Sequence, residues 1–492
     1  MTERHRIAGI VALCAAIQLP GMGRAPHYDE PNFLRLASGA TVDAWRPHDV
    51  MINWQGTAER AFDVLSNPPG IAWWLAPWLH APTWTLRLTM LPWLALAAFG
   101  AWRLGERFLG DGAKGALVLL LSPIAIVSTT ALTPDAPLYA LVLAGVGGYI
   151  HASDRDRPTA GWALLAGMAA IFRYSGLCVM PLLGMYAVLR GRSPATALLA
   201  WLPAAGLALH DIHAYGRVHV LAMGAFQSVA NTPADVYHKC IASLAMLGGA
   251  ALLPMYRWRW GALAGAAAGG TAGSGWGVQG VIFGALGGAA LGGAVADGPA
   301  REDGWFLRAW ALGGLAFLLT LRFTAGRYWL PFLPGIALAL PVNPWMIAAG
   351  ATLGVALATD DAASANAQEA LADGLTFILK DVESTDRNVT GHWGWQYAME
   401  KRGWKELDAG THPMEGALVA IPTEAWPQSV VATCATVLRE AEAMPPHPWL
   451  VRGYSRLGGA NLHANWIAPH VRTIAPWTFA SDPYERVRVC QE

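Results

Sequence analysis

Apolar runs of about 14–21 residues follow one another along most of the chain and are separated by short polar segments. A helix that crosses a membrane needs about 20 such residues, and fewer where interfacial side chains flank it. The pattern therefore predicts about thirteen membrane-spanning helices. These helices are expected over 7–23, 84–102, 114–131, 136–151, 159–172, 176–190, 195–211, 240–256, 260–273, 276–296, 305–321, 328–341 and 344–359.

The stretch 260–296 can be read as one span or as two. It is rich in Gly and Ala, and small residues let helices approach closely in lipid. Gly273–Gly277 would be the turn between two spans, whereas one long tilted span would reverse the orientation of everything after it.

Charge changes along the chain. Charged residues make up 14% of the sequence, where a soluble domain carries about 25%. Residues 360–492 hold 28 of the 68 charges, and residues 1–359 hold the other 40. The net charge is zero, which excludes a typical nucleic-acid binder, and the apolar content excludes a disordered chain or an ordinary water-soluble enzyme. We therefore expect a polytopic α-helical membrane part over 1–359 and a soluble domain over 360–492.

The soluble domain is expected to be α/β. Apolar or alternating runs at Gly416–Ile421, Trp449–Arg452 and Arg486–Val489 predict strands, and Thr433–Ala443 predicts a helix. Gly391–Tyr397 is an unusually aromatic cluster.

Lys and Arg of short loops predict the orientation, because they favour the cytoplasmic side. With the N-terminus inside, the segments 24–83, 132–135, 173–175, 212–239 and 322–327 lie outside, and so does 360–492. The inner loops then carry the basic residues Arg4, Arg6, Arg103, Arg107, Lys114, Arg155, Arg157, Arg190, Arg192, Arg257, Arg259 and Arg301.

The outer loop 24–83 carries the first candidate chemistry. Its aromatic stretch Pro69–Trp78 is typical of a helix that lies on the membrane surface. Asp29 and Glu30 form an acid pair just outside the first span, and such a pair acts as a general base, binds a cation or orients a sugar hydroxyl. The alternative is a pair of solvated loop acids. Asp135, between Pro134 and Pro137, is either a functional acid or the N-cap of the next helix.

Basic residues on the outer side are few. Arg173, followed by Tyr174, and Arg327, followed by Tyr328, interrupt apolar sequence at that edge. An outer Arg either snorkels to a lipid headgroup or binds an anion such as a phosphate. The neighbouring His210, Asp211 and His213 indicate either a polar loop or a metal cluster.

The order of these motifs resembles the GT-C superfamily of integral-membrane glycosyltransferases. The acid pair comes first, followed by Asn67-Pro-Pro-Gly, Arg87-Leu, Thr-Pro-Asp135, Arg173-Tyr-Ser-Gly and Gly-Arg327-Tyr-Trp-Leu-Pro. The set looks closest to the bacterial lipid A aminoarabinose transferases and the protein O-mannosyltransferases. It covers most of residues 1–345.

The resemblance implies a donor sugar linked to a polyprenyl phosphate and an acceptor that is a lipid, a glycan or a protein. By that analogy Asp29 deprotonates or orients the acceptor, Glu30 supports it and Asp135 is a second acid. Arg173 and Arg327 would hold the donor phosphate. Substrate binding would also involve Tyr174, Tyr328, Asn67 and Arg87. The implied place is the bacterial inner membrane, with the lipid bilayer as a further partner and no role for nucleic acid.

One departure concerns metal use. Close relatives of the aminoarabinose type carry Glu-Lys before the two prolines, where this chain has Ser66-Asn67. A phosphate-binding Lys and a metal-binding acid are thereby missing, so no cofactor is assigned, and a divalent cation is left open. Arg60 or Arg87 would offset the lost Lys.

Two other classes compete with the glycosyltransferase. A flippase, polymerase subunit or transporter for lipid-linked glycans would share the outer Arg residues, yet it would not need the acid pair. A scaffold that displays residues 360–492 would leave Asp29 and Asp135 without a role.

Cys434 and Cys490 are the cysteines of the expected outer domain. They form either a disulfide, because that compartment is oxidising, or two buried free thiols.

Overall fold

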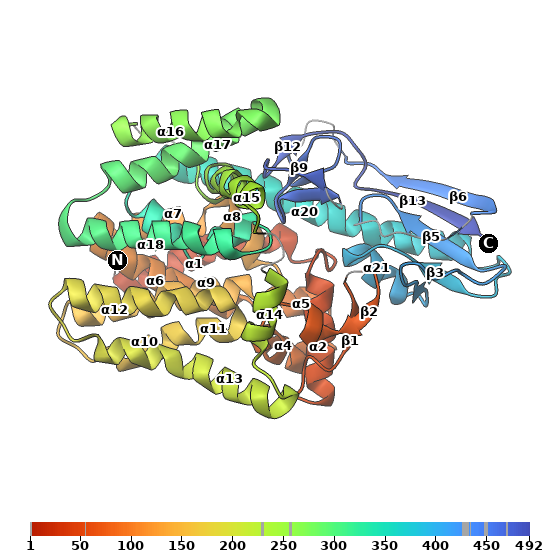
Figure 1. Cartoon of the computed structure of the whole chain (residues 1–492), viewed down its shortest axis with the longest axis horizontal. Coiled ribbons are helices and arrows are strands. Elements are labelled where there is room, and N and C mark those ends of the chain that lie inside the picture. The colour runs from red at the N-terminus through yellow and green to blue at the C-terminus, as the bar shows by residue number, and fades with distance from the viewer. Residues whose placement is uncertain are drawn as a thin grey trace.

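The computed structural model describes residues 2–54, 56–227, 231–254, 258–425, 432, 434–446, 451–468 and 471–492. Helices dominate as far as residue 378, and short strands follow them. In Figure 1 the N-terminus lies in the helical part at the left, and the C-terminus lies in a sheet at the right. The chain is therefore mostly helical, and its β structure is concentrated after residue 386, as predicted.

The elements are as follows. The N-terminal part contains α1 (Glu3–Gln18), η1 (Leu19–Gly21), α2 (Glu30–Val42), β1 (Met51–Asn53), β2 (Ala58–Arg60), α3 (Ala61–Val64), α4 (Gly70–Leu75), η2 (Ala76–Trp78) and α5 (Thr83–Leu88). The bundle continues with α6 (Leu91–Leu109), α7 (Gly112–Leu120), α8 (Pro123–Thr129), α9 (Asp135–Ser153), α10 (Ala160–Gly167), α11 (Ala169–Phe172), η3 (Tyr174–Cys178), α12 (Val179–Leu189), η4 (Pro194–Trp201), α13 (Leu202–Tyr215) and α14 (His219–Gln227). It ends with α15 (Pro233–Met246), η6 (Leu247–Ala251), α16 (Trp260–Gly273), η7 (Ser274–Trp276), α17 (Gly277–Gly292), η8 (Gly293–Asp297), α18 (Arg301–Thr320), η9 (Gly326–Trp329), α19 (Leu333–Ala337) and α20 (Pro344–Ile378). The C-terminal part contains β3 (Arg387–Val389), α21 (Trp393–Glu400), β4 (Lys405–Glu406), β5 (Leu418–Pro422), β6 (Thr436–Ala443), β7 (Val451–Arg452), β8 (Tyr454–Ser455), β9 (Ala460–Asn461), β10 (Trp466–Ala468), β11 (Val471–Arg472), β12 (Thr478–Phe479) and β13 (Glu485–Gln491).

Helix α9 is the core of the bundle, because nearly all of its side chains are buried. A helix that is apolar on all sides can be buried on all sides. Gly100 of α6 lies so close to α9 that a Cβ there would meet the backbone carbonyl carbon of Leu143 at 2.1 Å. The backbones of α6 and α9 are therefore closely packed in the middle of α9, which begins at Asp135.

The Gly-rich stretch 260–296 folds as an antiparallel hairpin. The pairs Gly265 with Gly288, Gly269 with Gly284 and Gly273 with Gly280 lie so close that an added Cβ would meet backbone atoms of the opposite helix. The partners run in opposite directions along the chain, and Ser274–Trp276 forms the turn. The reading as two helical segments is therefore the one that the structure shows.

Among the described residues, four helical stretches are long and apolar enough to cross a membrane, or five if the bent pair α7 and α8 counts as one span. The four are Asp135–Ser153, Pro194–Tyr215, Trp260–Asp297 and Pro344–Ile378. Trp260–Asp297 has this length only when its two antiparallel helices are counted together. Several predicted spans are divided into shorter helices, as α10 and α11 divide 159–172. The number of about thirteen spans stays a prediction.

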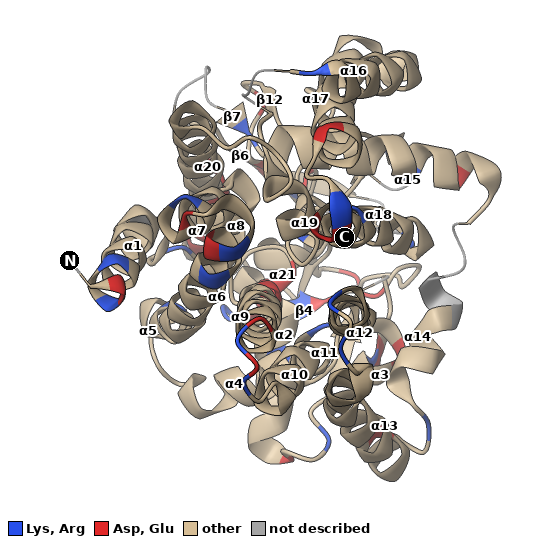
Figure 2. Ribbon diagram, turned by 90° about the vertical axis from the view of Figure 1, so that its left-hand side faces the viewer, with Lys and Arg blue, Asp and Glu red and all other residues tan. Residues whose placement is uncertain are grey.

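Charged residues that the sequence assigns to inner loops meet at one end of the bundle. Arg107 in the last turn of α6 bonds Asp154 at 2.7 Å and Asp303 of α18 at 2.8 Å, and Arg190 after α12 bonds Asp303 at 2.5 Å. Figure 2 looks at the bundle from the side that is on the left in Figure 1, and its charged segments lie mainly at helix ends and in loops. The compartment that this end faces stays a prediction.

The C-terminal part is built on a five-stranded sheet in the order β4-β3-β5-β13-β6. Strand β3 runs parallel to β4 and β5, and β13 runs antiparallel to β5 and β6. The predicted strands at 416–421 and 486–489 correspond to β5 and β13, and the described half of 449–452 is β7. The remaining two residues, 449 and 450, lie outside the described residues.

The predicted helix over 433–443 is wrong, because residues 436–443 form the edge strand β6. Leu438, Glu440 and Glu442 favour helices by local propensity. Pairing with β13, in which Arg488 lies opposite Glu440, overrides that preference, as tertiary context commonly does.

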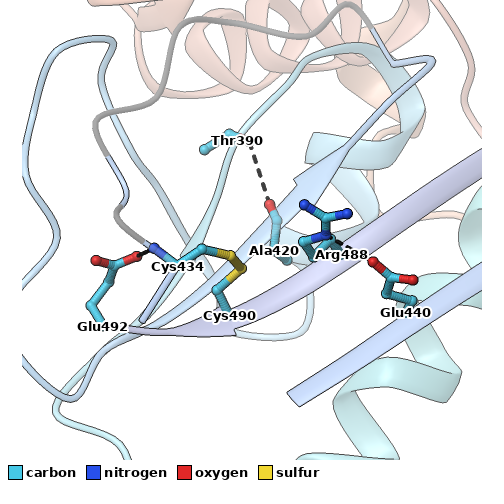
Figure 3. Close-up of a disulfide and its surroundings, with 7 residues drawn as sticks. All are labelled: Thr390, Ala420, Cys434, Glu440, Arg488, Cys490 and Glu492. Carbon is cyan, nitrogen blue, oxygen red and sulfur yellow. Dashed lines mark hydrogen bonds and ion pairs between the residues drawn. A yellow bond between two sulfur atoms is a disulfide. The ribbon is translucent and has the colours of Figure 1, made fainter. Parts of the chain in front are cut away.

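The predicted disulfide is confirmed. Cys434 and Cys490 are bonded, with 5.0 Å between their Cα atoms (Figure 3). The backbone N–H of Cys434 also donates to the Glu492 carboxylate at 2.8 Å. The bridge therefore ties the chain before β6 to the end of β13, beside the C-terminus.

The predicted domain boundary does not fall in a loop or at a helix end, since residues 359 and 360 both lie inside α20. The predicted surface stretch 69–78 contains α4 and η2, and Trp78 is 48% exposed while Ile71 and Leu75 are buried. The division into two domains and the contact with a membrane surface stay predictions.

Candidate active site

Asp29 is the N-cap residue of α2, at the end of the loop that follows η1. Pro31 lies in the first turn of α2, where a proline fits because backbone N–H groups of a first turn have no partner within the helix. The Asp29 carboxylate accepts a hydrogen bond from Nη2 of Arg327 at 2.6 Å, and its side chain is 26% exposed. Asp29 is thus held in place by one guanidinium and remains accessible.

Asp135 lies at the start of α9 and is 1% exposed. An acid in the first turn is favoured by the helix dipole. Arg173, between α11 and η3, donates to Oδ1 of Asp135, and Nε of Arg327 lies 3.6 Å from Oδ2. Two Arg residues that are far apart in sequence therefore meet on one carboxylate, and the alternating series Asp29, Arg327, Asp135 and Arg173 has a net charge of zero.

A cavity of about 410 Å³ opens beside this series. Its polar wall contains Asn67, Asp135, Arg173, Tyr174, Arg327 and Tyr328. Its apolar wall contains Leu138, Val220, Met223, Phe317, Leu321 and Phe323. Six of the nine predicted site residues thus share one cavity, and Asp29 adjoins it through Arg327.

The ring of Tyr328 lies beneath both cations. The guanidinium carbon of Arg173 is 4.6 Å from the ring centre, and that of Arg327 is 5.3 Å away. Such cation–π contacts hold a guanidinium in position and leave N–H groups in its plane for other partners.

Glu30 and Arg87 do not line the cavity. Arg87 is 0% exposed and makes two hydrogen bonds of 2.9 Å to the two oxygens of Glu30. Glu30 also accepts from Arg24 at 2.6 Å and from the backbone N–H of Leu132 at 2.9 Å. Burial alone would raise the pKa of Glu30, yet Arg24 and Arg87 reverse this and lower its pKa to about 2. The pair is placed to hold the loop before α2, and its predicted roles in catalysis and binding stay predictions.

The sequence analysis missed residues that lie next to Asp29 and Arg327. Arg327 donates to the backbone carbonyl of His463 at 3.3 Å. His463 in turn lies 3.3 Å from Asp361, which also binds Arg24 and His27. No local sequence pattern identifies Asp361 or His463 as site residues, because their contacts with the site involve residues about 100 or more positions away in the sequence.

Asp361 is a buried acid at the centre of this group. Its carboxylate pairs with Arg24 and lies 3.3 Å from ring nitrogens of both His27 and His463. Asp361 thereby joins the loop before α2 to the C-terminal part of the chain.

His210 and Asp211 use their polar atoms in other contacts, and the ring of His213 packs edge-on against Trp45. Nε2 of His210 lies 2.8 Å from the carbonyl of Trp45, and Asp211 accepts from the backbone N–H of His219 at 3.1 Å. Within the part of the chain that the structure describes, no group of three or more His, Cys, Asp or Glu side chains could hold a metal ion.

Fold and site together define a helical protein with several helices of membrane-spanning length and a charged cavity at one end of the bundle. No protein-family model and no curated protein matches the sequence. Among solved structures, the chain is similar to the crystal structure of ArnT from Cupriavidus metallidurans bound to undecaprenyl phosphate, with 14% identity over 85% of this chain and 93% of that one, and a TM-score of 0.43. The apo structure of the same protein matches with 14% identity over 80% and 84%, and a TM-score of 0.42.

ArnT is a lipid A aminoarabinose transferase of the GT-C class, so these neighbours belong to the class that the ordered motifs resemble. The roles proposed below rest on the side chains of this protein.

Proposed function

We propose that the protein is a membrane glycosyltransferase that moves a sugar from a polyprenyl-phosphate-linked donor to an acceptor at the outer face of the membrane. The observation that carries the proposal is the meeting of Arg173 and Arg327 in the wall of a cavity that apolar side chains also line. A phosphate attached to a long hydrocarbon chain needs both kinds of wall.

The donor phosphate would lie against the two guanidinium groups. Arg173 bonds Asp135 through Nη1, and the rest of its planar fork of five N–H groups can bind phosphate oxygens. The first prenyl units would contact Leu138, Phe317 and Phe323. Because the four-residue charge series is neutral without a ligand, the bound phosphate adds one negative charge, which the cations stabilise as the phosphate leaves.

Two polar atoms of the protein in the cavity wall are available to form hydrogen bonds with the sugar. Oδ2 of Asp135 and Oγ of Ser175 are buried and have no hydrogen-bond partner among the described residues, and both side chains line the cavity. Buried polar atoms are normally satisfied. Sugar hydroxyl groups would satisfy both of them and would fix the orientation of the ring.

Asp29 would act on the acceptor from the other side of Arg327. Its carboxylate takes the proton of the acceptor hydroxyl, whose oxygen forms the new bond to the anomeric carbon. The bond from that carbon to the phosphate oxygen breaks, and the electron pair leaves with the phosphate. A single displacement of this kind inverts the anomeric carbon.

The first experiment measures binding of undecaprenyl phosphate to the purified full-length protein by native mass spectrometry. Arg173→Met and Arg327→Met should each weaken binding by about 10-fold, since each removes charged hydrogen bonds. Arg46→Met is the matched control, because Arg46 is exposed and lies outside the cavity. Equal binding by all four proteins would contradict the proposed donor site.

A second experiment separates transfer from transport. The protein is incubated with radiolabelled polyprenyl-phosphate sugars and lipid, glycan and peptide acceptors, and labelled acceptor is counted. A transferase releases free polyprenyl phosphate in step with product. Binding of the donor with no transfer to any acceptor, together with movement of the lipid across vesicles, would instead favour a flippase.

A further inference from the structure

The loop between β9 and β10 lies against the segment that carries Arg327. The carbonyl of Leu462 accepts from the backbone N–H of Gly326 at 3.0 Å, and the side-chain oxygen of Asn465 accepts from the backbone N–H of Thr324 at 3.0 Å. The C-terminal part of the chain therefore sets the path of the backbone just before Arg327.

His463, in the same loop, contacts both sides of the Asp29–Arg327 pair. Nη1 of Arg327 donates to the His463 carbonyl and lies 3.5 Å from its Nδ1. The ring of His463 packs on Tyr28, with ring centres 3.9 Å apart. Tyr28 directly precedes Asp29 and has φ 47°, a conformation that a bulky residue keeps only when its surroundings enforce it.

Asp361 orients the imidazole from the opposite side. Its Oδ1 lies 3.3 Å from Nε2 of His463. A carboxylate only accepts hydrogen bonds, so Nε2 carries the hydrogen, and Nδ1 is then free to accept from Arg327. Burial lowers the pKa of His463, an effect that Asp361 partly offsets, so the neutral ring is favoured at neutral pH.

We infer that His463 is a positioning residue of this site, and that the C-terminal part of the chain completes the site by holding Arg327 against Asp29. The inference deepens the proposed function and rests on it for the role of the pair. His463 touches neither the donor nor the acceptor. It acts through the orientation of a guanidinium that faces both the cavity and the proposed base.

Acid should weaken this arrangement. The groups that face His463 are Asp361 of α20, Arg327 of η9, and His27 and Tyr28 before α2. A protonated ring would place a second N–H on Nδ1, opposite the N–H groups of Arg327, and two cations would then face each other. Transfer is therefore expected to fall as His463 becomes protonated.

The test uses two variants of His463, of which only one keeps a hydrogen-bond acceptor for Arg327. His463→Asn keeps an oxygen near the position of Nδ1, and His463→Leu has a similar size without an acceptor. His412→Gln is the control, because His412 is an exposed His of the same part of the chain. The probe is phenylglyoxal, which modifies Arg, and mass spectrometry follows the peptide that contains Arg327.

In His463→Leu, Arg327 loses the hydrogen bond that it donates to the imidazole, so phenylglyoxal should label Arg327 about 5-fold faster. Labelling in His463→Asn and in His412→Gln should stay within about 2-fold of wild type. Equal labelling in all proteins would overturn the inference. Fast labelling in both His463 variants would overturn it as well, since packing alone would then explain the contact.

The turnover experiment adds a readout that packing does not change. In His463→Leu, kcat/KM for transfer from the donor should fall about 10-fold, because the misplaced Arg327 serves both the donor and Asp29, and His463→Asn should restore it. In wild type, transfer should decline with acid more than in His463→Asn, because only wild type carries the imidazole whose protonation opposes Arg327. A decline that both proteins share comes from other groups. If wild type transfers no sugar, the proposed function fails, while the labelling result still decides the inference.

Discussion

Replacement of Arg87 by Met should be the most destabilising single change at the loop that carries Asp29. Arg87 is fully buried, and its two 2.9 Å hydrogen bonds to Glu30 join α5 to α2. It also donates to the carbonyl of Thr130 at 2.7 Å. Met matches the length of the Arg stem but leaves Glu30 with Arg24 as its cationic partner.

Two estimates give the size of the effect. Removal of one partner from a buried ion pair costs about 3–5 kcal/mol. The fall in the pKa of Glu30 from 4.5 to about 2, which Arg24 and Arg87 cause together, corresponds to roughly 3 kcal/mol of stability shared between the two pairs. That stability is present above pH 4.5 and is lost as pH falls through about 2, because a lowered acid pKa stabilises the charged fold. The loss in Arg87→Met should therefore be about 3 kcal/mol at pH 7.

The assay is thermal unfolding of the full chain in detergent at pH 7. Arg87→Met should lower the melting temperature by about 5 °C or more. Arg60→Met is the control, because Arg60 is 39% exposed and its pairs with Asp49 and Asp63 are surface pairs that contribute at most about 1 kcal/mol. Adding Glu30→Gln to Arg87→Met should recover part of the loss, since the double variant has no uncompensated carboxylate. Equal melting of Arg87→Met and Arg60→Met would refute the reasoning.

Three further outcomes are expected. Asp29→Asn should keep its melting temperature and lose about 100-fold in transfer, and near wild-type transfer would remove Asp29 as the base. Cys434→Ser should lower the free energy of unfolding by up to about 4 kcal/mol, because the loop that the disulfide closes is freed. In differential scanning calorimetry, wild type with reductant should unfold at the same temperature as Cys434→Ser. Burial and the neighbouring Glu400 raise the pKa of Glu406 to about 8, so stability should fall between pH 4.5 and 8. The free energy of unfolding of Glu406→Gln should then exceed that of wild type by about 1 kcal/mol at pH 8 and equal it at pH 4. An equal gain at both pH values would contradict the expected fall of stability with rising pH.

The charged residues at the two ends of the bundle illustrate what a sequence can reveal. The rarity of Arg on the expected outer side singled out Arg173 and Arg327, and their meeting on Asp135 is a structural fact. The separate roles of Asp29 and Glu30 were not visible, because adjacent residues at a helix start point in different directions. Glu30 points inward to Arg87, and Asp29 points toward Arg327.

By itself the sequence determined the mostly helical character of residues 1–359, the strands β5 and β13, the cysteine pair and the small set of polar residues at the cavity. Hydrophobic periodicity and the scarcity of charge in lipid-like segments are local properties, so they can be read along the chain. Only the tertiary structure decided that 436–443 is a strand, that 260–296 is a hairpin, and that His463 and Asp361 adjoin Arg327. Those outcomes depend on partners far away in sequence, whose pairing energy exceeds the local preference of the residues involved.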